Sequence, residues 1–333
     1  MKVIDPGLLT TVQDRGRFGY QKDGVTPGGA MDLIALTVAN SLVGNDESAA
    51  ALEVTIAGPS IEFRQDELVS VCGADLTAEM ASIRLPTWRG IYVRSASVMS
   101  FGEARWGCRA YLAVAGGIDV PAVMGSRSTN LRARIGGIKG RALRADDQVP
   151  TPPRRPGDPI AAGAAAGGGP MPFALSERFV ETAEAASLYG DQKSVRVLPG
   201  PHLELFDERD RRLFLERAFE VSPRSDRMGY RLAGPVLDSS PRAELVSSAV
   251  LMGTVQVPGG GEPILLMADR QTTGGYPAIA QVTTADLPLI AQLKPGDEVR
   301  FELVTLDQAH AALRAQRATL EAIRGRVKRD APS

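Results

Sequence analysis

Polar side chains that could bind an anion or act on a carbonyl group are concentrated in a few glycine-rich segments. The first segment covers residues 6–45, where Gln13, Asp14, Arg15 and Arg17 lie among several glycines. Glycine lets backbone N–H groups approach a ligand closely, and arginine binds carboxylate or phosphate through two parallel hydrogen bonds. The segment is therefore a candidate anion site, although a turn with a surface ion pair explains the same residues.

A helix is expected directly after this segment, over residues 31–42. Asp32 is placed to act as an early helical carboxylate or as the N-cap, and Asn40 follows about two turns later. Gly44 and Asn45 are expected to end the helix, because glycine readily adopts the left-handed conformation found there. We include Asp32 and Asn40 among the candidate binding residues.

The second candidate segment covers residues 116–130 and contains Ser126 and Arg127 on a turn that begins with glycine. Hydroxyl groups and a guanidinium on such a turn suit an anion, although a hydrogen-bonded loop has the same composition. The sequence GGIKGR at residues 136–141 has a similar but weaker pattern.

Two further segments lie in the second half of the chain. Residues 222–234 resemble the first segment and contribute Asp226, Arg227 and Arg231. Residues 253–277 combine an apolar strand pattern with a dense polar group made of Gln256, Asp269, Gln271, Thr272 and Tyr276. Polar groups at the end of a buried strand are costly to desolvate unless they bind each other or a ligand, so we favour a site here.

Several kinds of chemistry are disfavoured by the composition. The chain has only two histidines, His202 and His310, and only two cysteines, Cys72 and Cys108, which we interpret as buried free thiols. No nucleophile elbow, zinc-ligand spacing or phosphate-binding P-loop motif occurs, and no metal site is expected. Catalysis would therefore rely on carboxylates, arginine, glutamine, lysine and backbone groups.

Short apolar or alternating segments separated by glycine, proline and aspartate dominate the rest of the chain. This pattern predicts a mainly β fold of sandwiches or barrels. Helical spacing is found only at residues 31–42, 203–215 and 306–327. We expect the last of these helices to pack on the body of the protein.

The bulk composition describes a globular protein without an obvious polyanionic partner. The chain has 333 residues, 44% of them apolar, and a formal net charge of −1. This balance gives no electrostatic reason to expect nucleic acid or membrane as a partner. No secretory signal and no apolar run of about 18 residues is seen, so a cytoplasmic location is expected.

A stretch rich in proline, glycine and alanine, residues 151–172, is expected to be a linker or long loop that buries no core. The halves on either side share short matches: residues 14–20 with 226–230, 52–54 with 243–245, and the segment from 101 with that from 295. These matches predict a duplicated β-unit with a cleft between two similar domains.

The four candidate segments together resemble the family of the C subunit of bacterial 5-oxoprolinase, which includes allophanate hydrolase subunit 2 and resembles part of the carboxyltransferase domain of urea carboxylase. The motifs that carry the resemblance are VQDRGRFGY, AGGID with GSRST, SDRMGYRL, and GTVQVP with PILLMADRQTTGGYP. The resemblance implies two cyclophilin-like β-barrel domains with a few short helices. We place them at residues 1–150 and 173–310, followed by a C-terminal helix or tail at 311–333.

The resemblance also implies a role in an ATP-dependent amidohydrolase complex that opens 5-oxoproline to glutamate. Its partners would be the B subunit and the lactam-opening A subunit of that complex, its substrate a small amide, and its cofactor ATP with Mg²⁺. No Met-Lys-Met segment is present, so no biotin is expected on this chain. The segment GGSSGG typical of amidases is also absent, which disfavours allophanate hydrolysis by this chain alone.

Carried onto this sequence, the resemblance implies an inter-domain site. The candidate catalytic residues are Asp226, Arg227, Asp269 and Arg15. The candidate substrate- or nucleotide-binding residues are Gln13, Arg17, Asp32, Asn40, Ser126, Arg127, Arg231, Gln256, Gln271, Thr272 and Tyr276. Arginines would neutralise a transferred phosphoryl group, and an aspartate would orient water or deprotonate an amide nitrogen.

Two other functions are compatible with the same residues. The chain could be a carboxyltransferase that accepts a carboxyl group from carboxybiotin, or a component of an enzyme that processes allophanate or urea. It could also be a non-catalytic binding module that regulates a sensor kinase.

Overall fold

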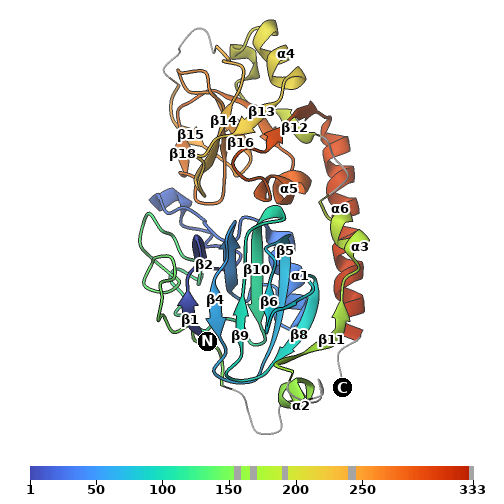
Figure 1. Ribbon diagram of the computed structural model, residues 1–333. Coiled ribbons are helices and arrows are strands. Elements are labelled where there is room, and N and C mark those ends of the chain that lie inside the picture. The colour runs from blue at the N-terminus through green and yellow to red at the C-terminus, as the bar shows by residue number, and fades with distance from the viewer. Residues whose placement is uncertain (154–158, 166–170, 190–193, 239–244, 330–333) are drawn as a thin grey trace. The chain divides into compact units, whose positions relative to one another are not determined.

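The computed structural model describes residues 1–153, 159–165, 171–189, 194–238 and 245–329, which form two compact units (Figure 1). The first unit comprises Met1–Arg17, Asp32–Leu188 and the end of the chain from Thr319. The second unit comprises Phe18–Met31 and Tyr189–Ala318.

The first unit contains an antiparallel six-stranded sheet in the order β11-β8-β5-β10-β3-β2. Its strands are β2 (Leu9–Gln13), β3 (Ala51–Thr55), β5 (Glu67–Asp75), β8 (Arg89–Val93), β10 (Trp106–Val114) and β11 (Phe173–Phe179). The central strands β5 and β10 are buried along almost their whole length. Both faces of the middle of this sheet are therefore covered.

Alternation along the central strands explains how both faces are filled. Val69 and Leu112 point into the apolar core of the first unit, whereas the buried side chains of Ser70 and Tyr111 do not belong to that core. Helix α1 (Leu33–Leu42) packs against β5 and β10, and Ser70 Oγ donates to the carbonyl of Ala39 on this helix over 2.7 Å.

A second sheet of the first unit has five strands in the order β1-β4-β9-β6-β7. These strands are β1 (Lys2–Asp5), β4 (Ser60–Glu62), β6 (Glu79–Met80), β7 (Ile83–Arg84) and β9 (Val98–Ser100). Val3, Ile61 and Met99 from this sheet join Val69 and Leu112 from the larger sheet in one apolar core. The first unit is therefore held by packing between two sheets.

The second unit is built on an eight-stranded sheet in the order β20-β13-β14-β17-β16-β19-β12-β21. Its strands are β12 (Val195–Pro199), β13 (Phe219–Val221), β14 (Gly229–Ala233), β16 (Thr254–Gln256), β17 (Ile264–Leu266), β19 (Ala278–Val282), β20 (Glu298–Val299) and β21 (Phe301–Leu303). The two edge strands, β20 and β21, are separated only by Arg300. The sheet therefore nearly closes into a barrel, and the predicted mainly β fold class is confirmed.

Smaller elements complete the second unit. Strands β15 (Ser248–Ala249) and β18 (Thr273–Gly274) form a separate pair. Aromatic side chains fill part of the barrel core, where the rings of Phe214 and Phe301 stack with centroids 4.5 Å apart. The helices of this unit include α4 (Glu208–Glu216), α5 (Leu287–Ala291) and the 3-10 turns Gln21–Asp23, Leu203–Leu205 and Thr284–Asp286.

Two of the predicted helices agree closely with the structure, and one is divided. Helix α1 ends as expected, with Gly44 in the left-handed conformation at φ 77°. The predicted helix at 203–215 begins instead as a 3-10 turn, and α4 starts only after Asp207, whose carboxylate caps the amide of Asp210. None of the helices in the described ranges is long and apolar enough to cross a membrane.

The C-terminal helix α6 (Leu306–Arg329) packs on the protein, as predicted. Ile323 and Val327 are fully buried within the first unit. Arg326 forms an ion pair with Glu184, which lies on α3 (Thr182–Ser187). The apolar spacing that predicted a packed helix is therefore confirmed for this part of the helix.

The boundary between the two units differs from the sequence-based expectation at residue 173. Strand β11 pairs with β8 in the first unit, which extends to Leu188. Within the expected linker, residues 159–165 form helix α2 (Pro159–Ala165), and Ile160 and Ala164 are buried. Residues 154–158 and 166–170 of that linker lie outside the described residues. Composition alone did not indicate this helix, because the surrounding stretch is rich in proline and glycine, which disfavour helices.

Two of the three short sequence matches lie in different structural contexts. Residues 14–20 follow the end of β2, whereas residues 226–230 lead into β14. Strand β10 is central in its sheet, whereas its proposed counterparts β20 and β21 lie at the sheet edges. Residues 243 and 244 of the remaining match lie outside the described residues. The duplicated β-unit therefore stays a prediction.

Candidate functional site

A carboxylate at the end of β2 organises the glycine-led turn at residues 123–128. Asp14 Oδ1 accepts hydrogen bonds from the Ser126 hydroxyl at 2.6 Å, from the Gly16 amide at 2.8 Å and from the Ser128 hydroxyl. Asp14 Oδ2 accepts from the Arg127 amide at 2.6 Å. Asp14 is only 7% exposed, so this carboxylate fixes the conformation of the turn from inside the protein.

The predicted binding residues Ser126 and Arg127 are brought together by this carboxylate. The Ser126 hydroxyl donates to Asp14, whereas the Arg127 guanidinium extends to the Val120 carbonyl at 2.9 Å and to Asp119 at 3.7 Å. The side chain of Arg127 is 43% exposed and is therefore accessible. Asp14 was not among the predicted binding residues, although its position before Gly16 is a usual sign of a side chain that caps a turn.

Gln13 and Arg17 hold the same turn on its other side. The Gln13 amide nitrogen donates to the Thr11 hydroxyl at 3.0 Å and to the Thr129 carbonyl at 3.1 Å. Arg17 donates to the Ser128 carbonyl and is 1% exposed. Both predicted binding residues thus contribute to the architecture of the turn.

Arg15 lies apart from these contacts. Its guanidinium forms an ion pair with Glu47 at 2.8 Å and is 44% exposed. Arg324 on α6 binds the other oxygen of the same carboxylate at 3.2 Å. The alternative interpretation of a surface ion pair therefore describes Arg15 well.

The residues predicted on α1 have structural contacts. Asp32 caps the helix through the Ala35 amide at 2.9 Å, as the alternative of an N-cap anticipated. Asn40 donates to the Ala49 carbonyl at 2.8 Å and accepts from Asn45 at 3.0 Å. These contacts hold the two ends of the helix.

A buried polar network in the first unit was not predicted from the sequence. Tyr111 on β10 accepts from the Asp32 amide at 2.8 Å and donates to Glu53 on β3 at 2.7 Å. Glu53 also lies 3.9 Å from the guanidinium of Arg109. Asp32, Glu53, Tyr111 and Arg109 are all less than 5% exposed. For Glu53, Arg109 and Tyr111 the sequence signal was a polar residue within an otherwise apolar strand.

Burial determines the protonation of this network. The pKa of the Tyr111 hydroxyl is raised well above its usual value, first by burial and then by the negative charges of Glu53 and Asp32. The hydroxyl therefore stays protonated at neutral pH and remains a donor to Glu53. Burial also raises the pKa of the Cys72 thiol, which supports the prediction of an inert, buried cysteine.

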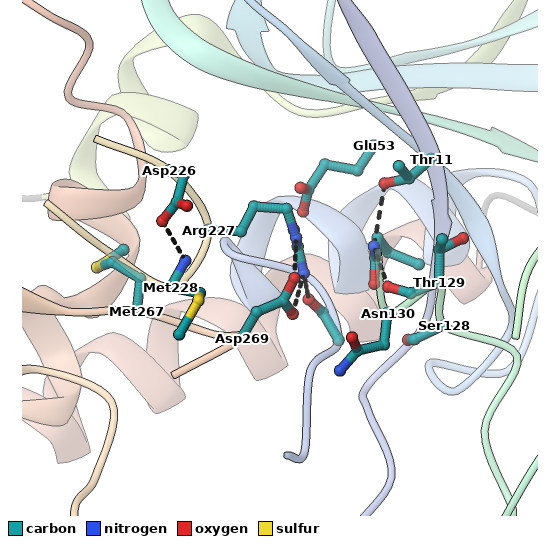
Figure 2. A network of polar contacts seen from close by, with 12 residues as sticks. Thr11, Glu53, Ser128, Thr129, Asn130, Asp226, Arg227, Met228, Met267 and Asp269 are labelled. Carbon is teal, nitrogen blue, oxygen red and sulfur yellow. Dashed lines mark hydrogen bonds and ion pairs between the residues drawn. The ribbon is translucent and has the colours of Figure 1, made fainter. Parts of the chain in front are cut away.

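In the second unit, Arg227 and Asp269 are bound to each other (Figure 2). The Arg227 guanidinium donates to the two carboxylate oxygens at 3.0 and 3.1 Å, and to the Gly29 carbonyl at 2.6 Å. The Asp269 amide donates to the Arg227 carbonyl at 2.8 Å. Both side chains are at least 93% buried, so the pair joins the loop before β14 to the loop after β17.

Asp226 and Arg231 flank this pair but face solvent. Asp226 Oδ1 accepts from the amides of Met228 at 2.8 Å and Gly229 at 3.2 Å, so its side chain closes its own turn. Arg231 is exposed, and its amide donates to the Ser225 hydroxyl at 3.1 Å. Asp226 is therefore accessible to a ligand but is also a turn-forming residue.

Two glutamine side chains meet beside Gly274 in the second unit. Gln271 donates weakly to Gln256 at 3.4 Å, and Gln256 donates to the Tyr276 carbonyl at 3.2 Å. A Cβ on Gly274 would lie 2.7 Å from the Gln256 amide nitrogen and 3.3 Å from that of Gln271. The glycine therefore allows both amides to approach the backbone closely.

The exposure of this glutamine group differs from residue to residue. Gln256 is 2% exposed, Gln271 and Thr272 are half-buried, and Tyr276 is 52% exposed. The Thr272 carbonyl accepts from the Val250 amide at 3.2 Å. This group therefore combines the fixed amide of Gln256 with the accessible polar side chains of Gln271, Thr272 and Tyr276.

The remaining expectations about ligand types concern metals and histidine. No group of three or more histidine, cysteine, aspartate or glutamate side chains that could hold a metal occurs in the described ranges. His202 accepts from the Ala278 amide at 3.2 Å, a structural contact.

Several known proteins are similar to this chain in sequence and in fold. A family model described as carboxyltransferase domain, subdomain A and B, matches residues 23–303. The chain is 37% identical to the C subunit of 5-oxoprolinase from Escherichia coli, over 98% of both chains, and 36% identical to that from Haemophilus influenzae, over 97% of both. The crystal structure of the K. lactis urea amidolyase is also similar, with a TM-score of 0.80 and 27% identity, and the match covers 97% of this chain but 20% of that one. The chain therefore belongs to the family of carboxyltransferase domains, subdomain A and B.

Proposed function

We propose that this chain is one component of an ATP-dependent amidohydrolase complex that opens 5-oxoproline to glutamate, acting with the B subunit and the lactam-opening A subunit of that complex. The observation that carries the proposal is the 37% identity to the C subunit of E. coli 5-oxoprolinase over 98% of both chains. A match over both full lengths supports a shared role better than a match to one domain of a larger enzyme.

The chemistry requires activation of a stable lactam. Transfer of the γ-phosphoryl group from ATP, with Mg²⁺, to the amide oxygen releases ADP and makes the carbonyl carbon susceptible to water. Addition of water and cleavage of the C–N bond open the ring, and a second water releases the phosphate to leave glutamate. Cationic side chains then stabilise the charge that develops on the transferred group. No biotin on this chain is involved in such a reaction.

Within this chain, we assign substrate contact to the group around Gly274. A primary amide side chain donates and accepts one hydrogen bond side by side, which is complementary to the N–H and C=O of a lactam. Gln271 is half-buried and makes only a 3.4 Å contact to Gln256, so its amide is available for a ligand. Tyr276, whose backbone carbonyl accepts from Gln256, is 52% exposed and adds an accessible side chain.

The pair Arg227 and Asp269 has a different role in this proposal. Because the two side chains neutralise each other in a bidentate contact, they position the loop that carries Gln271. Arg15 remains a candidate for contact with an anionic group, and Asp226 remains a candidate for orienting water or accepting a proton, since both side chains are exposed.

The test is reconstitution of the complex with and without this chain. We expect ATP-dependent release of glutamate from 5-oxoproline only when the chain is present together with its partners. Equal activity without the chain, or no ATP consumption with 5-oxoproline, urea or allophanate, would contradict the proposal. The last result would favour the non-catalytic regulatory module.

A carboxyltransferase function is the second candidate. It is favoured by the description of the matching family model and by the similarity to the K. lactis urea amidolyase over 97% of this chain. Incorporation of labelled bicarbonate into urea, dependent on a biotin carrier protein, would distinguish this function from lactam opening.

A further inference from the structure

A pocket of about 670 Å³ in the first unit takes no part in the proposed substrate contacts. It is lined by the segment 134–140 on one side and by aliphatic side chains that include Val120, Val123 and Pro150. Pockets of about 300–1,000 Å³ with apolar walls and a few polar groups are typical ligand sites. The sequence GGIKGR, which resembled an anion-binding turn, forms part of this wall.

The charge of the pocket is positive. Arg134 and Lys139 line it and are exposed, and neither side chain forms a hydrogen bond or salt bridge with any residue that the structure describes. No aspartate or glutamate belongs to the lining. Asp147 lies next to the lining residue Gln148 and is bound by Arg141 at 2.7 and 2.8 Å. The charge of Lys139 also acts on this carboxylate and helps to lower its pKa.

A buried cation lies directly behind the glycine wall. Gly136 and Gly137 have φ values of 69° and 51°. A Cβ on Gly136 would lie 2.8 Å from Nη2 of Arg17, and one on Gly137 would lie 1.9 Å from Oγ1 of Thr129. Only glycine therefore fits at these two positions, because a side chain would overlap Arg17 or Thr129.

Hydrogen-bond donors are also available at this wall. The Thr129 hydroxyl is completely buried and has no partner among the described residues. The backbone N–H groups of Gly136, Ile138 and Lys139 likewise donate to no group in the described part of the chain. These three amides lie in a partly exposed glycine-rich segment beside Arg134 and Lys139, and successive backbone N–H groups of this kind can bind an anion.

We propose that this pocket binds the phosphate groups of a nucleoside triphosphate. Arg134, Lys139 and the amides of Gly136, Ile138 and Lys139 hold the phosphates, and the aliphatic wall contacts the nucleoside. The volume exceeds what a single inorganic anion needs, which favours a nucleotide-sized ligand. The choice of ATP as this nucleotide rests on the proposed function.

The test is titration of the full-length chain with ATP in a calorimeter, at low salt. We expect saturable binding, weakened at least about tenfold by Arg134→Gln and by Lys139→Gln, because each removes a charge-assisted contact. Arg105→Gln removes an exposed cation of the same unit outside the pocket lining and is the matched control. It should change the affinity less than about twofold.

Competition identifies the group that binds. Inorganic phosphate should displace ATP at high concentration, whereas 5-oxoproline should not. The proposal is overturned if ATP does not bind saturably, if both pocket variants bind like the wild type, or if Arg105→Gln weakens binding equally. If the two pocket variants bind ATP as the wild type does and support wild-type turnover in the reconstituted complex, the pocket is not the ATP site and the proposed function still stands. Conversely, if the chain binds ATP and Lys139→Gln weakens that binding, but the reconstituted complex does not open 5-oxoproline, the proposed function fails and the proposed ATP site stands.

Discussion

The substitution Asp14→Asn tests whether one buried carboxylate holds the turn at residues 123–128. The carboxylate accepts four hydrogen bonds, three at Oδ1 and one at Oδ2 from the Arg127 amide. An asparagine presents only one oxygen. In either orientation, a backbone N–H of Arg127 or Gly16 faces an amide N–H instead of an acceptor.

The expected cost follows from these contacts. Loss of one charge-assisted hydrogen bond costs about 1.5–3 kcal/mol, and an unsatisfied buried N–H adds a further penalty of similar size. Because the turn relaxes in part, we expect a loss of about 3 kcal/mol in the free energy of unfolding of the first unit. Asp5→Asn is the control, since Asp5 is exposed and accepts only the Gly7 amide at 2.8 Å, which an asparagine oxygen also accepts.

Tryptophan fluorescence during urea unfolding reports this change. Both tryptophans of the chain, Trp88 and Trp106, belong to the first unit. Asp14→Asn should lower the urea midpoint of the fluorescence transition without altering its slope, and Asp5→Asn should leave the free energy of unfolding within about 0.5 kcal/mol of the wild type. An Asp14→Asn variant within about 1 kcal/mol of the wild type would refute the reasoning.

Three further predictions concern other buried groups. Arg227→Gln should destabilise the second unit by about 3–5 kcal/mol in thermal unfolding followed by circular dichroism, because it leaves the Asp269 carboxylate buried without its partner. The double variant Arg227→Gln with Asp269→Leu should recover most of this loss. A single variant as stable as the wild type would contradict this prediction. Cys72 should react with a thiol reagent only at the rate of local unfolding, since burial raises the pKa of its thiol, and a rate in native buffer equal to that of a free peptide cysteine would disprove this. The pKa of Tyr111 is raised in the folded state, so above the usual tyrosine pKa of about 10 the unfolded state alone releases the proton. The free energy of unfolding should therefore be unaffected by this group below about pH 10 and fall by up to about 1.4 kcal/mol per pH unit above it. Tyr111→Phe should flatten this decline in urea titrations between about pH 8 and 11, and an unchanged slope would contradict the argument.

Local patterns were sufficient to predict much of the fold. Alternation and glycine punctuation predicted a mainly β chain, and the 3–4 spacing with Asp32 in front predicted α1. The assignment of β11 failed because a strand's partner is set by distant pairing, and nothing within residues 173–179 indicates that β8 accepts them. The composition of residues 151–172 likewise could not show that Ala164 is buried.

The polar contacts were harder to predict because they join remote parts of the chain. Asp14 and Ser128 are separated by 114 positions, and Tyr111 and Glu53 by 58. Each of these residues has an ordinary local context, so only the folded sheet shows that they meet. Clusters that are dense in sequence, such as Gln271 to Tyr276, could be selected as candidates because closely spaced polar groups at a strand end need a partner or a ligand.

Contact between the Gln271 amide, beside Gly274, and the lactam is the central element of the proposed function. The direct measurement is the steady-state rate of ATP-dependent glutamate release by complexes that carry Gln271→Ala or the control Gln21→Ala, in which an exposed glutamine of the same unit is changed. We predict that Gln271→Ala lowers kcat/KM for 5-oxoproline at least about tenfold while the complex still assembles. The variant loses the two hydrogen bonds between the glutamine amide and the N–H and C=O of the lactam. Gln21→Ala should match the wild type. Wild-type kcat/KM in the Gln271→Ala complex would contradict the claim.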